Sequence, residues 1–308
     1  MSFIIFQIEN QLKFRKNDNT VSIFGITKDP KLQDYMIVME YARKGSLRKM
    51  LDQNLKGLSW DEILKNLLYI SDGLSEIHKA GLVHKDFHSG NIVMSDTGSS
   101  ITDFGMCKPL LQDLSQGNKV YGVLPYVAPE VLKGKNYTQA SDVYSFGIIM
   151  IEVITGFPPF YDFPHNENLA ISICEGLRPT IGRKIPKLVA TLIDQCLDAD
   201  PTKRISAEQL KSTLDQYYTD VDYNDEDSII CKQVKSCAEY DPNYNPGIVS
   251  GGNYVKHPEA YYTSKLLNFG SLPDPVSVSI SIAETKQLEL VIPNYLEDMV
   301  NTSEEDEV

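Results

Sequence analysis

The sequence predicts an α+β fold, with a small β-rich part first, a larger helical part second and an acidic tail last. Residues 1–45 contain two runs, VSIFGI and DYMIVMEYA, that are rich in β-branched and aromatic residues and are separated by a turn at KDPKLQD. Residues 46–218 carry apolar residues at helical spacing. Residues 219–308 contain acidic clusters, proline and glycine, which predicts a largely disordered tail.

Four segments carry the helical prediction. The first, DEILKNLLYISDGLSEIHKAG, ends at Gly81, a residue type that commonly follows helices. The second, QASDVYSFGIIMIEVITG, ends in the same way at Gly156. The third and fourth are KLVATLIDQCLD and SAEQLKSTLDQYY, and the fourth has Ser206 as its expected N-cap with Gln209 three positions later.

Composition restricts the classes of function. The chain has 308 residues and a net charge of −13, which argues against a broad surface for nucleic acid or membrane. No apolar run is long enough to span a bilayer, and the first residues lack the basic region of a signal peptide. The five cysteines have no zinc-like spacing, so reduced thiols are expected. We therefore expect a cytoplasmic location, with the nucleus as the alternative, and neither nucleic acid nor membrane as a partner.

Residues 84–91, HKDFHSGN, concentrate two histidines, one aspartate and one asparagine. His84 and His88 are four positions apart and could share a zinc ion on a helix. However, the phenylalanine, serine and glycine of this stretch make a poor helix, and no glutamate follows the first histidine. The metal interpretation is therefore weaker than a loop that transfers phosphate, either to a small molecule or to a protein.

Phosphoryl transfer requires a carboxylate that orients and deprotonates the attacking hydroxyl, together with oxygen ligands for Mg²⁺. In the D-x-x-x-x-N pattern of this stretch, Asp86 would be the base and Asn91 a metal ligand. Asp103 follows in SITDFGM, at the expected end of a strand and before a flexible Phe-Gly pair, where its carboxylate would be a second Mg²⁺ ligand. These three residues are the predicted catalytic set, with Mg²⁺ as the metal that Asn91 and Asp103 would bind.

The combination of HKD…N with DFG resembles the kinase superfamily. Small-molecule kinases have a loop like HGDLHxGN and protein kinases one like HRDxxxxN, and residues 84–91 alone resemble both. Downstream motifs favour the protein kinases, because VAPE supplies an APE motif ending at Glu130, SDVYSFG contains Asp142, and DPTKRIS contains Arg204. The resemblance covers residues 20–217 and is strongest to tyrosine-kinase-like protein kinases of the expanded fungal type.

The resemblance implies roles for further residues. Asp142 would brace the backbone of the catalytic loop, and the guanidinium of Arg204 would pair with the Glu130 carboxylate. His84, Phe104 and Gly105 would be structural and would link the catalytic loop to the DFG motif. The residues that would hold the adenine of ATP are Met39 as gatekeeper, the hinge residues Glu40, Tyr41 and Ala42, and Val93.

The implied function is a two-lobe protein kinase that transfers the ATP γ-phosphate to a hydroxyl of a protein substrate, with a weak preference for serine or threonine. The other hypotheses are a pseudokinase or scaffold and, less favoured, a small-molecule phosphotransferase. No G-x-G-x-x-G loop and no V-A-I-K lysine precede VSIFGI, which predicts a truncated N-lobe. The expected division is therefore a partial N-lobe with hinge at 1–45, an intact C-lobe at 46–218 and, at 219–308, a tail of unknown partner.

Overall fold

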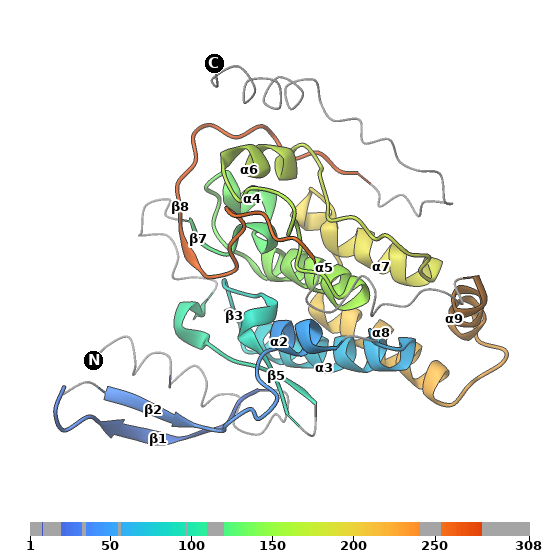
Figure 1. Ribbon diagram of the computed structural model, residues 1–308, viewed down its shortest axis with the longest axis horizontal. Coiled ribbons are helices and arrows are strands. Elements are labelled where there is room, and N and C mark those ends of the chain that lie inside the picture. Colours follow the sequence, from blue (N-terminus) through green and yellow to red (C-terminus); the bar gives the residue numbers. More distant parts are fainter. Residues whose placement is uncertain are drawn as a thin grey trace, which may run out of the picture.

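The molecule consists of a small two-stranded sheet beside a larger helical body (Figure 1). The structure is a computed structural model. It describes residue 8 and the ranges 20–32, 35–54, 57–95, 98–109, 120–240 and 254–278. Helices and short strands both occur, in agreement with the predicted α+β class. Among the described helices, none is both long and apolar enough to cross a membrane.

The two predicted N-terminal strands form a hairpin. Strand β1 (Ile23–Lys28) pairs antiparallel with β2 (Tyr35–Met39). The turn between them is stabilised by Asp29, whose carboxylate accepts hydrogen bonds from the backbone N–H groups of Lys31 and Leu32. Apolar side chains on this hairpin remain in contact with solvent, and Phe24 is 70% exposed. The hairpin therefore contributes little to the core, which lies in the helical body.

The helical body is built around α5 (Gln139–Thr155), in which every residue from 141 to 155 is buried. Helix α7 (Lys187–Leu197) packs against α5, and α3 (Trp60–Lys79) packs against α8 (Ala207–Asp222). Capping boxes start α3 at Ser59 and α8 at Ser206, as reciprocal side-chain bonds satisfy the first free N–H groups. Further α-helices in the described part of the chain are α2 (Leu47–Gln53), α4 (Pro129–Leu132), α6 (Glu167–Cys174) and α9 (Ile229–Tyr240).

Three pairs of short strands connect these helices and position the loops between them. Strand β3 (Leu82–Val83) pairs with β6 (Lys108–Pro109), and β4 (Ile92–Met94) pairs with β5 (Ser99–Ile101). The third pair joins distant parts of the chain, because β7 (Val120–Gly122) is antiparallel to β8 (Lys265–Leu267). In Figure 1, β8 belongs to the orange-red segment that runs beside β7 and on past α6.

The prediction of a largely disordered tail does not hold for residues 219–240 and 254–278. Helix α8 continues to Asp222, and α9 follows it with Ile230 buried against the core. Residues 254–278 lie along the helical body, with Leu267 and Leu272 buried in the core. Overall acidity dominated the prediction, whereas a few apolar side chains decide whether a segment docks. Residues 241–253 and 279–308 lie outside the described residues.

Candidate active site

The loop of residues 84–91 lies between β3 and β4, and Asp142 of α5 binds its backbone. The Asp142 carboxylate accepts hydrogen bonds from the backbone N–H groups of His84 (2.8 Å) and Lys85 (3.0 Å). Lys85 has φ +72°, a left-handed conformation that is uncommon for a residue other than glycine. Two charge-assisted bonds therefore hold a turn that the chain would otherwise rarely adopt. His78 adds a third bond to the same carboxylate, at 3.0 Å.

Asp86 and Asn91 are joined to each other within this loop. The Asn91 side-chain amide donates to the backbone carbonyl of Asp86 at 2.9 Å and to its carboxylate at 3.3 Å. His88 Nε2 lies 3.6 Å from Asp86 Oδ1. Burial alone would raise the pKa of Asp86, but the neighbouring His88 ring and the hydroxyl of Ser264 bring it below its ordinary value. The carboxylate is therefore ionised at neutral pH and available to accept a proton.

His84 packs between two aromatic rings and connects the catalytic loop to the DFG motif. Its ring centroid lies 5.5 Å from that of Phe87 and 5.6 Å from that of Phe104. Its Nε2 lies 3.1 Å from the carbonyl oxygen of Thr102, so that nitrogen is committed to the backbone. The described residues contain no group of three or more His, Cys, Asp or Glu that could hold a metal ion.

Burial lowers the pKa of His84 below its ordinary value, because the apolar surroundings disfavour the charged ring. Near and below about pH 6.5 the unfolded chain therefore binds a proton that the folded chain excludes, and stability falls as pH falls. We expect the free energy of unfolding to decrease between pH 7.5 and about pH 5. Urea titrations at each pH measure this free energy. The variant His84→Gln cannot titrate but keeps a donor for the Thr102 carbonyl, so its free energy of unfolding should depend less on pH. An unchanged slope would contradict this role.

Asp103 and Asn91 offer oxygen atoms to a hard cation. Asp103 adopts a left-handed conformation (φ 60°, ψ 66°), and its exposed carboxylate accepts one bond, from Gly105 N–H at 3.3 Å. The side-chain N–H₂ group of Asn91 donates to Asp86, so the side-chain oxygen of Asn91 is available to a cation. Mg²⁺ prefers oxygen ligands and commonly takes only one or two from the protein, with phosphates and water completing the shell. The two residues therefore fit a Mg²⁺ that is shared with a nucleotide.

The predicted adenine-binding residues lie on two neighbouring stretches. Met39 ends β2, and the run from Glu40 to Ala42 follows it, where Glu40 N–H donates to the carbonyl of Ser22. The chain then passes beside β4, because Met94 N–H donates to the carbonyl of Gly45 at 2.8 Å. Ser46, four residues after Ala42, forms an isolated antiparallel bridge with Val93. This bridge connects the chain that follows the hinge run to the strand that contains Val93. Met39 itself is 36% exposed in this arrangement.

A buried ion pair fixes the segment that follows β7. Arg204 donates from both terminal nitrogens to the Glu130 carboxylate, at 2.8 and 2.7 Å. The same guanidinium also donates to the carbonyls of Ala140 and Asp198. Because Glu130 lies in the first turn of α4 and Arg204 precedes α8, the pair connects the end of this segment to the helical body.

A second buried network was not predicted from the sequence. The Glu152 carboxylate of α5 accepts hydrogen bonds from Arg48 of α2 (2.7 Å), from the Ser89 hydroxyl (2.8 Å) and from the Tyr126 hydroxyl (2.7 Å). Burial and the Glu152 charge raise the pKa of Tyr126 far above its ordinary value, so it stays a donor. This network anchors the far end of the catalytic loop. Its members lie too far apart in sequence for any local pattern to reveal them.

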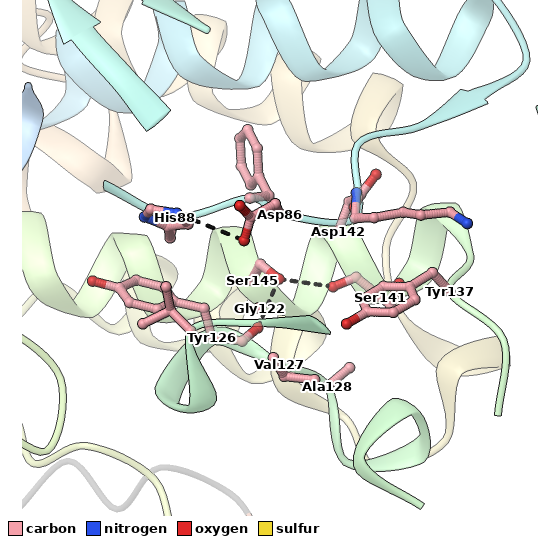
Figure 2. A pocket seen from close by; sticks show the side chains of 13 residues that line it. Asp86, His88, Gly122, Tyr126, Val127, Ala128, Tyr137, Ser141, Asp142 and Ser145 are labelled. Atoms are coloured by element: carbon pink, nitrogen blue, oxygen red, sulfur yellow. Dashed lines mark hydrogen bonds and ion pairs between the residues drawn. The ribbon is translucent and has the colours of Figure 1, made fainter. Parts of the chain in front are cut away.

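A small pocket lies between the catalytic loop and the segment after β7, with Asp86 and His88 on one side and Tyr126 and Val127 on the other (Figure 2). Its far wall is α5, where the Ser145 hydroxyl donates to the Tyr126 carbonyl at 2.7 Å. Asp86 Oδ1 is buried and accepts no hydrogen bond from the described residues. This oxygen lies 3.6 Å from Nε2 of His88, which also lines the pocket.

Ser264 contacts the predicted base, and it was not selected from the sequence. The Ser264 hydroxyl donates to Asp86 Oδ2 at 2.6 Å and lies 3.4 Å from His88 Nε2. Ser264 immediately precedes β8, so the strand pairing with β7 places it there. No feature of the surrounding sequence marks this serine, because the contact depends on a segment that returns to the site from far along the chain.

Comparison with known proteins gives a family for this arrangement. A family model described as protein tyrosine and serine/threonine kinase matches residues 5–214. A probable serine/threonine-protein kinase of Dictyostelium discoideum is 31% identical over 224 residues, which cover 67% of this chain and 14% of that protein. The probable serine/threonine-protein kinase roco8 of the same organism is 33% identical over 214 residues, with 65% and 11% covered.

A mammalian protein gives a similar match. The human mitogen-activated protein kinase kinase kinase 4 is 29% identical over 204 residues, which cover 63% of this chain and 12% of that protein. The chain thus matches no more than about one seventh of the length of these curated relatives, at most 14%. The matched region contains the catalytic loop, the DFG motif and the Glu130–Arg204 pair.

Proposed function

The chain belongs to the protein tyrosine and serine/threonine kinase family, and from this premise we propose that it transfers the γ-phosphate of ATP to a hydroxyl group of a protein. The observation that carries the proposal is the ionised, buried Asp86 carboxylate, which lies within hydrogen-bond distance of a serine hydroxyl. That geometry is what a catalytic base requires. Serine or threonine is the proposed acceptor type, supported by that contact and by the names of the relatives.

Each residue of the site has a separate proposed task. Asp86 orients the acceptor hydroxyl and takes its proton, and Asn91 fixes the Asp86 backbone and carboxylate. Asp142 holds the loop backbone in its left-handed turn, and His84 with Phe104 fixes the distance between the loop and Asp103. Because Asp86, Asp142 and His84 are buried and Asn91 donates to Asp86, the base is held in place before the substrate arrives.

Asn91 and Asp103 are the proposed Mg²⁺ ligands, supported by the oxygen atoms that they leave available. When bound, ATP with Mg²⁺ supplies the phosphoryl group and neutralises charge that develops on it. The adenine is proposed to lie between the hinge, Met39 to Ala42, and Val93. This assignment rests on the resemblance of the sequence and on the proximity of the two stretches through the Ser46–Val93 bridge.

The N-lobe is proposed to be partial in this sequence. The printed sequence has no G-x-G-x-x-G loop and no V-A-I-K lysine, and the described part of its N-terminal region is a two-stranded hairpin. In the family these elements cover and pair with the phosphates. The proposed subclass is tyrosine-kinase-like, supported by the motifs HSGN and APE alone.

The proposed surroundings follow from the same residues. We propose a cytoplasmic location, supported by five cysteines that are all free thiols. The proposed division into a partial N-lobe, a C-lobe and a tail keeps the earlier boundaries at residues 45 and 218, except that α8 runs through the second of them to Asp222. The proposed partner is a protein substrate, and no nucleic acid is expected because the net charge is −13.

Phosphate transfer to casein and to the chain itself tests this function. The purified chain is incubated with radiolabelled ATP at several millimolar, with Mg²⁺, and thermal unfolding is followed in parallel. We expect label in protein that requires Mg²⁺, and a rise in Tm that requires both ATP and Mg²⁺. Label in neither protein, without a Tm shift, would sink the proposed activity and favour a binding module. Label in an added aminoglycoside or choline but not in protein would favour a small-molecule phosphotransferase.

A further inference from the structure

Residues 254–278 are held against the helical body before they reach the active site. The Tyr262 hydroxyl donates to the carbonyl of Pro159 at 2.9 Å, and its ring lies against that of His165 with centroids 5.1 Å apart. His165 also accepts the N–H of Tyr261 at 3.1 Å. Ala260 is buried between these contacts. The segment thus enters the site along the loop between α5 and α6.

The same segment is held again after it leaves the site. Strand β8 forms an antiparallel pair with β7, in which Lys265 faces Gly122 and Leu267 faces Val120. Leu267 is 5% exposed and belongs to the core, whereas the neighbouring Leu266 is 51% exposed. Further on, Gly270 N–H donates to Glu167 at 2.7 Å. Contacts on both sides therefore fix the backbone at Ser264.

Strand addition is one of the ways in which proteins bind extended peptides, because the backbone supplies affinity and alternate side chains supply selectivity. Here the added strand pairs with the segment that runs from β7 to the APE motif, next to the catalytic loop. Ser264 is the residue that this strand delivers to the base, and its hydroxyl is 2.6 Å from Asp86 Oδ2. The neighbouring Thr263 is exposed and makes no such contact among the described residues.

We propose that residues 254–278 are an acceptor segment in cis, which occupies the groove for a protein substrate and presents Ser264 as the phosphate acceptor. This inference rests on the proposed kinase activity and names its acceptor. The chain would then be its own substrate at one defined serine. While the segment is docked, the hydroxyl of another protein has no access to Asp86, so the segment also competes with external substrates.

The step balances with the groups that the proposal names. The Ser264 oxygen forms a bond to the γ-phosphorus of ATP as the bond from that phosphorus to the bridging oxygen of ADP breaks. The hydroxyl proton passes to Asp86 Oδ2 along the 2.6 Å hydrogen bond, and ADP leaves with the electron pair of the broken bond. The added phosphate brings negative charge next to the Asp86 carboxylate, which favours release of the modified segment.

Phosphosite mapping on the intact chain tests the acceptor role. The chain is incubated with ATP and Mg²⁺ at several chain concentrations, with casein as an added acceptor, and labelled sites are identified by mass spectrometry. We expect phosphate on Ser264 at a first-order rate that does not depend on chain concentration. Ser264→Ala should lose this label, whereas Thr263→Ala, the matched control, should keep it.

The outcomes separate this inference from the function on which it rests. Label in casein without label on Ser264 would overturn the acceptor role and leave the kinase activity standing. A rate on Ser264 that rises in proportion to chain concentration would overturn presentation in cis. Absence of label from both proteins would contradict the kinase activity itself, and the acceptor role with it.

Two matched leucine variants test the occupation of the groove. Leu267→Asp places a charge on the buried face of β8, and Leu266→Asp places the same charge on its exposed face. If the segment is docked in about nine tenths of the molecules, its release should raise the rate on casein about tenfold. We expect this rise, with loss of Ser264 label, only for Leu267→Asp, while circular dichroism confirms that both variants stay folded. Equal rates on casein for the two variants would contradict occupation of the groove. If Leu267→Asp loses helix, the double variant Ser264→Ala plus Tyr262→Ala replaces it. An unchanged rate on casein for that double variant would contradict occupation as well.

Discussion

Asp86→Asn is expected to reduce the rate of phosphate transfer, to Ser264 and to casein alike, by about 10²–10⁴-fold, the usual contribution of a catalytic base. An amide oxygen can still accept the hydrogen bonds of Asn91 and Ser264, which reach Asp86 at 3.3 and 2.6 Å. It cannot take up a proton at neutral pH. Rates of phosphate incorporation at saturating ATP and Mg²⁺ measure the loss, and the effect should appear in kcat.

The matched control is Asp215→Asn, which makes the same chemical change on the exposed face of α8. Its rate should equal that of the unmodified chain. Both variants should keep their far-UV circular dichroism, since neither creates a cavity. If Asp86→Asn retained more than about one tenth of the rate, another group would have to be the base, because a tenfold change is only about 1.4 kcal/mol of barrier.

Arg204→Ala is expected to lower the free energy of unfolding by about 3–5 kcal/mol, the usual loss when one member of a buried ion pair is removed. The side chains of Arg204 and Glu130 are 0% and 3% exposed, so Glu130 would remain as a buried charge without its bidentate partner. The carbonyls of Ala140 and Asp198 would also lose a donor. Urea denaturation followed by circular dichroism measures this loss through the midpoint at constant slope.

The neighbouring Lys203 provides the control for this prediction. Its side chain is 67% exposed and lies 3.9 Å from Asp200, so Lys203→Ala should change the stability by no more than about 0.5 kcal/mol. Replacing both members of the buried pair by methionine should recover much of the lost stability, because no charge is then left unpaired. A loss of under about 1 kcal/mol in Arg204→Ala would mean that water reaches Glu130 and compensates it.

Much of the helical body was predictable because its signals are local. Apolar periodicity and capping residues indicated α3, α5, α7 and α8, and the structure confirms the Ser206–Gln209 capping box and the left-handed C-cap at Gly156. The hairpin of β1 and β2 was predictable in the same way, from two β-rich runs and a turn that Asp29 stabilises. Such patterns depend on contacts between residues a few positions apart, so they can be recognised without knowledge of the fold.

The motifs located the candidate site but not the contacts that hold it. The order of HKD, DFG, APE and the following aspartate and arginine placed Asp86, Asp103, Glu130, Asp142 and Arg204 in one site. The network of Arg48, Ser89, Tyr126 and Glu152 was missed, since Arg48 and Glu152 are 104 positions apart. A buried carboxylate in the apolar helix α5 was the only available signal, because such a group needs partners.

The sequence by itself determined the family of this protein and the helices of its body, and it singled out the aspartate that we propose as the base, because these signals depend on local spacing. Only the tertiary structure decided what lies against that base. Ser264 is 178 positions from Asp86, and the strand pair of β7 and β8 with the burial of Leu267 brings them together. Acidic composition predicted disorder for this stretch, but docking depends on a few buried side chains and on backbone pairing with one particular partner strand, which composition does not record.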